Sequence, residues 1–177
     1  MLEVRPATPA DAEGLTETVV EGFASYRSFA PEGWAPPDRI ELGLGIAVAL
    51  RQGHQRTWVA VDADGHVTGQ VAYVPAAQSR MPADDPDLAH INQVFVRRAW
   101  WGTGLARTLL QVAVDDARAA GYTGMRLYTP EGQARARAFY EREGWTLTGP
   151  PLEGEPIGLT LVEYRRGLGG SGSRGSG

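Results

Sequence analysis

The stretch that decides the fold runs from Val94 to Arg107 and reads VFVRRAWWGTGLAR. Its first residues are β-branched and aromatic, which favours a strand, and the residues after Gly104 follow a helical pattern. A helix N-terminus has free N–H groups and the positive end of the helix dipole, so it attracts anions. Glycines at 102 and 104 let an anion approach the backbone there. The stretch therefore predicts a strand, a glycine turn and a helix that together hold a phosphate.

The composition restricts the class of protein. The chain has 177 residues, 42% of them hydrophobic and 21% charged, so we expect one globular domain with its own core. Its formal net charge of −4 gives no general attraction to nucleic acid. Cysteine is absent, which excludes disulfides and a cysteine nucleophile. All 17 basic residues are arginine, which we interpret as the mark of a GC-rich coding sequence.

The two ends of the chain predict its location and its domain boundary. Glu3 and Arg5 carry charges where a signal peptide needs an apolar core, and the run 42–50 is too short to span a bilayer. We therefore expect a cytoplasmic protein without a membrane partner. Residues 1–166 form the predicted domain, and residues 167–177, rich in glycine and serine, form a predicted flexible tail.

Hydrophobic periodicity and capping residues predict the element order βααβββαβαββ. The predicted strands cover residues 2–5, 57–61, 66–74, 90–96, 124–129, 145–148 and 156–165, with a hairpin turn around Pro150-Pro151. The predicted helices cover residues 8–25, 38–51 and 103–120, and a last helix is capped by Thr129 and ends at Gly144. This order is typical of an α+β domain with a mixed, mostly antiparallel sheet of six to seven strands and four helices.

A glycine turn before a helix also occurs in nucleotide-binding proteins. The dinucleotide fingerprint needs a third glycine, which is missing after Gly104, and its strand normally opens the domain. A Walker phosphate loop needs a lysine, and the chain has none. A nucleotide-binding domain and a purely structural turn stay open as alternatives on this motif alone.

Three stretches, in the same order, resemble the GNAT acetyltransferase superfamily. Residues 96–106 are similar to its acyl-CoA-binding motif, usually written Arg/Gln-x-x-Gly-x-Gly/Ala. Residues 134–145 are similar to its second signature, and residues 4–11 to its first strand and turn. Together they span about residues 2–165, and the resemblance implies an N-acyltransferase fold splayed at the central strand. The chain departs from the pattern at Trp101, where the family usually has Arg or Gln.

The resemblance also implies acetyl-CoA as the co-substrate and no metal. Backbone N–H groups of the glycine turn would hold the pyrophosphate, and the end of the preceding strand would pair with the pantetheine arm. Arg107 would add a cation for a phosphate or is a solvated arginine. The implied cofactor-binding residues are Val94, Phe95, Val96, Trp101, Gly102, Thr103, Gly104, Leu105, Ala106, Arg107 and Gln133. Gln133 stands where the family frequently has Asn.

The chemistry of the reaction suggests catalytic residues. An aliphatic amine, with a pKa of about 10.4, must lose a proton before it attacks a thioester, and the departing thiolate benefits from a proton donor. Tyr140 stands where the family usually places its general acid; without the resemblance it is a core tyrosine beside Phe139. His90 lies near the position where members often have a glutamate, so it is the candidate base, directly or through a water. Alternatively, His90 is an ordinary polar residue at the end of a strand.

The loop over residues 26–37 carries candidate acceptor-binding residues. Its aromatics and one carboxylate suit a cationic amine, and its alternative role is a hydrophobic lid on the sheet. The strand after His90 adds a polar side chain that alternation can turn toward the cleft. The candidates are Tyr26, Phe29, Glu32, Trp34 and Asn92. No second histidine lies near His90 in the sequence, and we interpret the acidic loop 84–87 as a solvated charge run, so no metal site is expected.

Together these features predict an N-acetyltransferase that moves an acetyl group from acetyl-CoA to a primary amine by direct attack. The alternative is a catalytically inactive acyl-CoA-binding or sensory module of the same fold. The acceptor stays open among small metabolites, antibiotics, polyamines, peptide N-termini and protein lysines. A homodimer is an expectation from the family.

Overall fold

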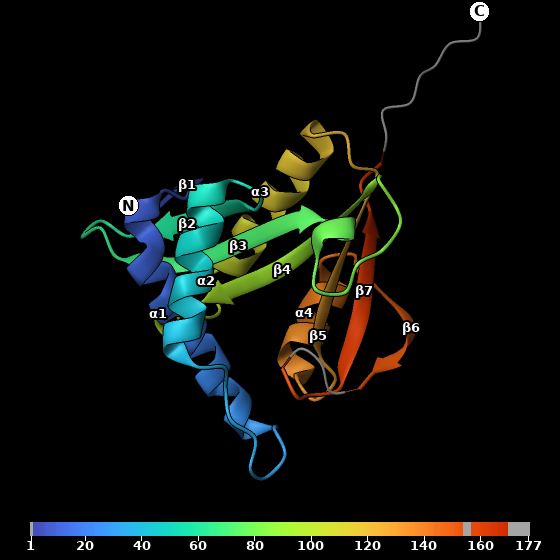
Figure 1. The fold of residues 1–177 in the computed structure, drawn as a ribbon, viewed down its shortest axis with the longest axis horizontal. Helices are drawn as coiled ribbons and strands as arrows, with labels where there is room; N and C mark the ends of the chain where they lie inside the picture. Colours follow the sequence, from blue (N-terminus) through green and yellow to red (C-terminus); the bar gives the residue numbers. More distant parts are fainter. Residues whose placement is uncertain (1, 154–156, 170–177) are drawn as a thin grey trace, which may run out of the picture.

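The computed structural model describes residues 2–153 and 157–169. A seven-stranded mixed sheet runs through it in the order β1-β2-β3-β4-β5-β7-β6 (Figure 1). The strands are β1 (Glu3–Pro6), β2 (Arg56–Val61), β3 (Val67–Pro75), β4 (Leu88–Val96), β5 (Gly124–Pro130), β6 (Thr146–Leu152) and β7 (Leu161–Gly167). The α-helices are α1 (Ala12–Ser25), α2 (Arg39–Gln52), α3 (Leu105–Ala119) and α4 (Ala134–Arg142). The predicted fold class is therefore confirmed.

The sheet opens between β4 and β5, as the N-acyltransferase fold implies. These two strands run parallel, and they pair from Leu88 opposite Gly124 to Ile91 opposite Leu127. β4 continues to Val96 and β5 to Pro130, but the two strands do not pair with each other beyond Ile91 and Leu127. They therefore separate toward their carboxyl ends (Figure 1). Backbone groups on this side of β4 are thus left without a neighbouring strand.

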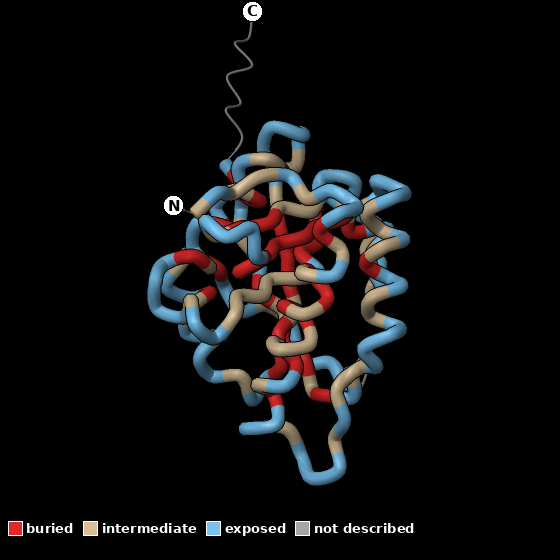
Figure 2. The backbone as a smooth tube through the Cα atoms, turned by 90° about the vertical axis from the view of Figure 1, so that its left-hand side faces the viewer, coloured by how far each residue is buried: buried red, intermediate tan, exposed pale blue. Residues whose placement is uncertain are grey.

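Two hydrophobic cores hold the helices on the sheet. The larger core packs α3 against β4, β5 and β7, with Leu109, Met125 and Tyr164 fully buried. The smaller core joins α1 and α2 to β2 through residues such as Leu15 and Val59. Buried residues follow the strands, and the outer turns of the helices are exposed (Figure 2). Among the described residues, no helix is both long and apolar enough to cross a membrane.

The predicted start of the last helix is wrong. Thr129 and Pro130 complete β5, and α4 begins at Ala134. β5 pairs with β7 as far as Pro130, and the Thr129 hydroxyl donates to the side-chain oxygen of Gln133 at 3.0 Å. Pairing with a neighbouring strand thus outweighs the Thr-Pro pattern, which favours a helix start only in isolation.

The C-terminal hairpin also differs from its prediction. β6 runs through Pro150-Pro151 to Leu152, so the turn is not at these prolines. Its register shifts between Thr148 and Leu152, which accommodates prolines on this edge strand. Leu168 is buried and its N–H donates to the Thr123 carbonyl at 2.9 Å, so the folded part extends past the predicted boundary at 166. Residues 154–156 and 170–177 of these predictions lie outside the described residues.

A buried carboxylate ties the first strand to the first helix. Asp11 accepts a hydrogen bond from each terminal nitrogen of Arg5 at 2.8 Å and from the Thr8 N–H at 2.7 Å. The Arg5 hydrogen bond, opposed by burial and assisted by Thr8, lowers the pKa of Asp11 to about 2. Asp11 therefore stabilises the fold in its charged form.

We expect Asp11→Asn to lower the free energy of unfolding by about 1–3 kcal/mol at neutral pH, because Arg5 loses a charged partner. The folded pKa of Asp11 is below its ordinary value, so the carboxylate stabilises the fold above about pH 5 and loses this effect as the pH falls toward 2. Urea unfolding should therefore show the difference from wild type shrinking over that range. The exposed Asp64→Asn is the control, and a difference independent of pH would contradict the account.

Candidate active site

The separated ends of β4 and β5 open into a cleft of about 510 Å³. Its walls come from β4, the turn between β4 and α3, the start of α3, the end of β5, and α4. Thirteen of the residues proposed from the sequence line it: Tyr26, Asn92, Val94, Phe95, Val96, Trp101, Gly102, Gly104, Leu105, Ala106, Arg107, Gln133 and Tyr140. The structure does not bring His90, Thr103, Phe29, Glu32 or Trp34 to this lining.

The glycine turn has a backbone that requires glycine. Gly102 has φ +80° and Gly104 has φ +88°, a region that strains residues with a side chain. No atom lies within 4 Å of a Cβ built at either position, so the space above the turn is open. Gly104 is the N-cap of α3 and supplies no side-chain cap, which leaves the first N–H groups of the helix available to an anion. The turn thus fits a phosphate group.

Two side chains hold the turn in this shape. The Thr103 hydroxyl donates to the Trp100 carbonyl at 2.7 Å, and Thr103 is exposed and is not part of the cleft lining. The Trp101 indole nitrogen donates to the carbonyl of Val96, the last residue of β4, at 2.8 Å. These bonds connect the turn to itself and to the strand before it.

Arg107 is paired rather than free. Its Nε lies 2.8 Å from a carboxylate oxygen of Glu143, and both residues line the cleft. The pair joins the first turn of α3 to the residue that follows α4. The positive charge that was expected to meet a phosphate is therefore compensated by a carboxylate.

Tyr140 is both a core residue and a cleft residue. It is buried on α4, with ring centroids of Phe139, Trp145 and Tyr164 at 5.3, 6.3 and 6.0 Å. Among the described residues, its hydroxyl has no hydrogen-bond partner, and the side chain lines the cleft. Burial, with a smaller contribution from Tyr26, raises the pKa of Tyr140 above its ordinary value. A phenol in this position keeps its proton and is able to donate it into the cleft.

His90 is buried and is not part of the cleft lining. Its side chain is buried, its ring centroid lies 5.6 Å from that of Tyr128, and its Nδ1 has no partner within the described part of the chain. Burial and the nearby charge of Arg126 lower the pKa of His90 to about 4. The imidazole is therefore neutral near pH 7, but the structure does not place it beside Tyr140 on the cleft surface.

The aromatic loop after α1 is mainly a packed lid. Phe29 covers the turn before α4, because a Cβ on Gly132 would lie 3.0 Å from its ring. The Trp34 indole donates to the Ile157 carbonyl at 2.9 Å, and Glu32 is exposed. Tyr26, in the short 3₁₀ turn that follows α1, reaches the cleft. Of the loop residues suggested for acceptor binding, Tyr26 is the one in position to contact an acceptor.

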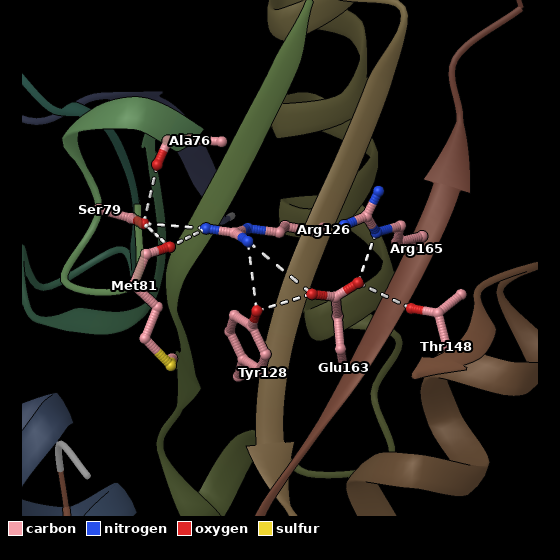
Figure 3. Close-up of polar contacts among 8 residues, drawn as sticks. All are labelled: Ala76, Ser79, Met81, Arg126, Tyr128, Thr148, Glu163 and Arg165. Carbon is pink, nitrogen blue, oxygen red and sulfur yellow. Dashed lines mark hydrogen bonds and ion pairs between the residues drawn. The ribbon is translucent and has the colours of Figure 1, made fainter. Parts of the chain in front are cut away.

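A buried charged network lies next to the cleft on β5 and β7 (Figure 3). Arg126 is 4% exposed and donates to Ser79 Oγ at 3.0 Å, to the Tyr128 hydroxyl at 3.2 Å and to the Met81 carbonyl. The Tyr128 hydroxyl in turn donates to Glu163 at 2.6 Å. Burial raises the pKa of Glu163, but hydrogen bonds from Arg165, Tyr128 and Thr148 outweigh it and lower the pKa overall.

Tyr128 connects this network to the cleft. It lines both the cleft and a second cavity of about 420 Å³, which is also lined by Thr148, Gly149, Pro150, Leu152, Glu163 and Arg165. Tyr128 was not predicted from the sequence, and neither were the cleft-lining residues Gly22, Ser25 and Arg135. The sequence did contain a signal for two residues of the charged network. Residues 126 and 128 belong to one predicted strand, so their side chains must share a face.

We expect Glu163→Ala to lower the free energy of unfolding by about 3 kcal/mol, since it leaves Arg126 as a buried charge without its carboxylate. Thr148→Val removes one hydrogen bond of 2.8 Å to the same carboxylate and should cost about 1 kcal/mol. Urea unfolding of both variants measures the difference. Equal costs would show that Glu163 does not compensate Arg126.

One group of potential metal ligands occurs in the described part of the chain. Ligand atoms of Asp62, Asp64 and His66 lie within 4.8 Å of one another in the turn between β2 and β3. The Asp62 carboxylate accepts the N–H groups of Asp64 and His66 at 3.0 and 2.9 Å, so it holds the turn. These hydrogen bonds account for the conformation of the exposed turn without a bound ion.

Comparison with known proteins shows the family. The profile of the acetyltransferase (GNAT) family matches residues 20–145, which include β4, the glycine turn and α4. The chain belongs to this family.

Curated relatives carry acetyltransferase names, and solved structures share the fold. N-acetyltransferase family 8 member 2 of Rattus norvegicus is 27% identical over 126 residues, covering 70% of this chain and 54% of that protein. The chain spans about half the length of the curated relatives it matches. A putative GNAT acetyltransferase from Desulfovibrio desulfuricans has a TM-score of 0.73 at 20% identity, covering 96% of this chain and all of that one. A putative acetyltransferase from Salmonella typhimurium, solved with acetyl-CoA, has a TM-score of 0.67 at 17% identity, covering 96% and 95%.

Proposed function

We propose that this protein transfers an acetyl group from acetyl-CoA to a primary amine in the cleft between β4 and β5. The observation that carries the proposal is that one cleft combines an open glycine turn with a buried, protonated tyrosine. The first feature suits a diphosphate and the second suits a departing thiolate. A structural neighbour solved with acetyl-CoA supports the choice of acyl donor.

The residues of the cleft fit coenzyme A in two further ways. β4 has no strand partner beyond Ile91 on the β5 side, so its backbone from 92 to 95 is available to an extended pantetheine arm. The first N–H groups of α3 have no side-chain cap, and the space around the Cβ positions of Gly102 and Gly104 is open, so a pyrophosphate would be held there. Gln133, whose side chain is oriented by Thr129, completes the opposite wall.

In the proposed reaction, acetyl-CoA supplies a thioester that an uncharged amine attacks directly. A carbon–nitrogen bond forms, the carbon–sulfur bond breaks, and Tyr140 gives its proton to the sulfur. A water takes the proton that leaves the amine nitrogen, because His90 lies outside the cleft lining, and a proton returns to the tyrosinate to restore Tyr140. Tyr26 and Asn92 are the acceptor-side residues that line the cleft. The Asn92 side chain is oriented by a hydrogen bond of 2.7 Å to Gln55.

The competing proposal is a catalytically inactive module that binds acyl-CoA. Thiol release from acetyl-CoA, measured with a panel of small metabolite amines, polyamines and peptides, distinguishes the two. Amine-dependent thiol release is expected of the enzyme. Binding of acetyl-CoA without turnover on any amine would favour the module. A homodimer and a cytoplasmic location stay predictions.

A further inference from the structure

Trp101 and Arg135 touch across the mouth of the cleft. Trp101 belongs to the turn between β4 and α3, whereas Arg135 belongs to α4, so two different elements of the cleft lining supply the pair. The guanidinium carbon of Arg135 lies 4.2 Å from the centre of the Trp101 ring. The indole is itself held by its 2.8 Å hydrogen bond to the Val96 carbonyl. A fixed aromatic ring thus supports a cation at the edge of the glycine turn.

The charge of Arg135 is uncompensated, unlike that of Arg107. Arg107 forms an ion pair with Glu143, but within the described residues no carboxylate lies within ion-pair distance of Arg135. A guanidinium stacked on an aromatic face keeps its N–H groups free in its own plane, where they bind oxyanions in a bidentate manner. Arg135 therefore presents free donors and a full positive charge to the cleft that it lines.

We propose that Arg135, positioned by Trp101, binds a phosphate group of coenzyme A from the α4 wall. This inference rests on the proposed function, since it requires coenzyme A in the cleft. It assigns the cationic contact to Arg135 rather than to Arg107, whose carboxylate partner would have to be displaced. It also gives the unusual Trp101 a role, which is to hold Arg135 in place across from the turn.

Titration calorimetry with coenzyme A and 3′-dephospho-coenzyme A at low ionic strength tests the proposal. We expect Arg135→Gln to weaken coenzyme A binding by about tenfold, the usual size of one charge-assisted contact. Arg51→Gln removes the same charge from exposed α2 and should bind within about twofold of wild type. Trp101→Phe keeps an aromatic face and should retain most of the affinity, whereas Trp101→Ala should lose several-fold.

The two ligands identify the phosphate. A loss with coenzyme A but not with the dephospho form assigns Arg135 to the 3′-phosphate, and an equal loss with both assigns it to the pyrophosphate. The proposal would be overturned if the Arg135→Gln variant bound coenzyme A as tightly as the Arg51→Gln variant. An unchanged affinity of Trp101→Ala would overturn the positioning role of the indole. A wild-type protein that binds neither ligand would instead refute the proposed function itself.

Discussion

Tyr140→Phe is expected to lower kcat by about 100- to 10,000-fold, the usual contribution of a general acid. The ring packs against Phe139, Trp145 and Tyr164, and its hydroxyl has no partner among the described residues. Removing the hydroxyl should therefore leave the free energy of unfolding nearly unchanged. Thiol-release kinetics at saturating acetyl-CoA, together with urea unfolding, measure both effects.

The pKa of Tyr140 gives this prediction a second readout. Burial raises that pKa, so the phenol should stay protonated at every pH below about 10. Ionisation of Tyr140 should therefore cause no loss of rate in this range. Tyr122→Phe is the matched control, because Tyr122 does not line the cleft and packs against Tyr73. A Tyr140→Phe enzyme with wild-type kcat would show that another group, or water, protonates the thiolate.

Gly104→Ala is expected to weaken binding of coenzyme A by about 10- to 100-fold. Gly104 has φ +88°, where a residue with a side chain is strained by roughly 1–3 kcal/mol. If the turn relaxes out of its binding shape to release this strain, the affinity for coenzyme A falls by the corresponding factor. Titration calorimetry measures the affinity, and the far-ultraviolet circular dichroism spectrum verifies that α3 persists.

Gly65→Ala is the matched control for backbone strain. Gly65 has φ +85°, it has open space around its Cβ position, and it lies in the turn between β2 and β3. Both variants should lose stability, but only the one at Gly104 should lose affinity for coenzyme A. Equal binding by the two variants would show that the turn before α3 does not hold the diphosphate.

Local patterns were sufficient to predict the frame of the site. The glycine turn, the strand before it and the helix after it are encoded in one continuous stretch, where local residue preferences and the positions of the glycines indicate the backbone conformation. The prediction of Tyr140 as the general acid came instead from the resemblance of residues 134–145 to a family signature. The failed helix start at Thr129 shows the limit, because pairing of β5 with β7 is decided by residues far away in the sequence.

Contacts between distant segments could not be predicted. Arg107 looked like a free cation in the sequence, and its pairing with Glu143 depends on how α4 packs beside α3. The contact between Trp101 and Arg135 arises from the same packing. His90 was placed on the correct strand, but the side on which its ring is buried depends on Arg126 and Tyr128 from β5.

A crystal structure of the protein with coenzyme A tests the central claim most directly. We expect density for the diphosphate against the backbone N–H groups of residues 102–107, for the pantetheine arm along β4, and for the sulfur next to the Tyr140 hydroxyl. Coenzyme A bound elsewhere, or bound here with its sulfur far from Tyr140, would contradict the account.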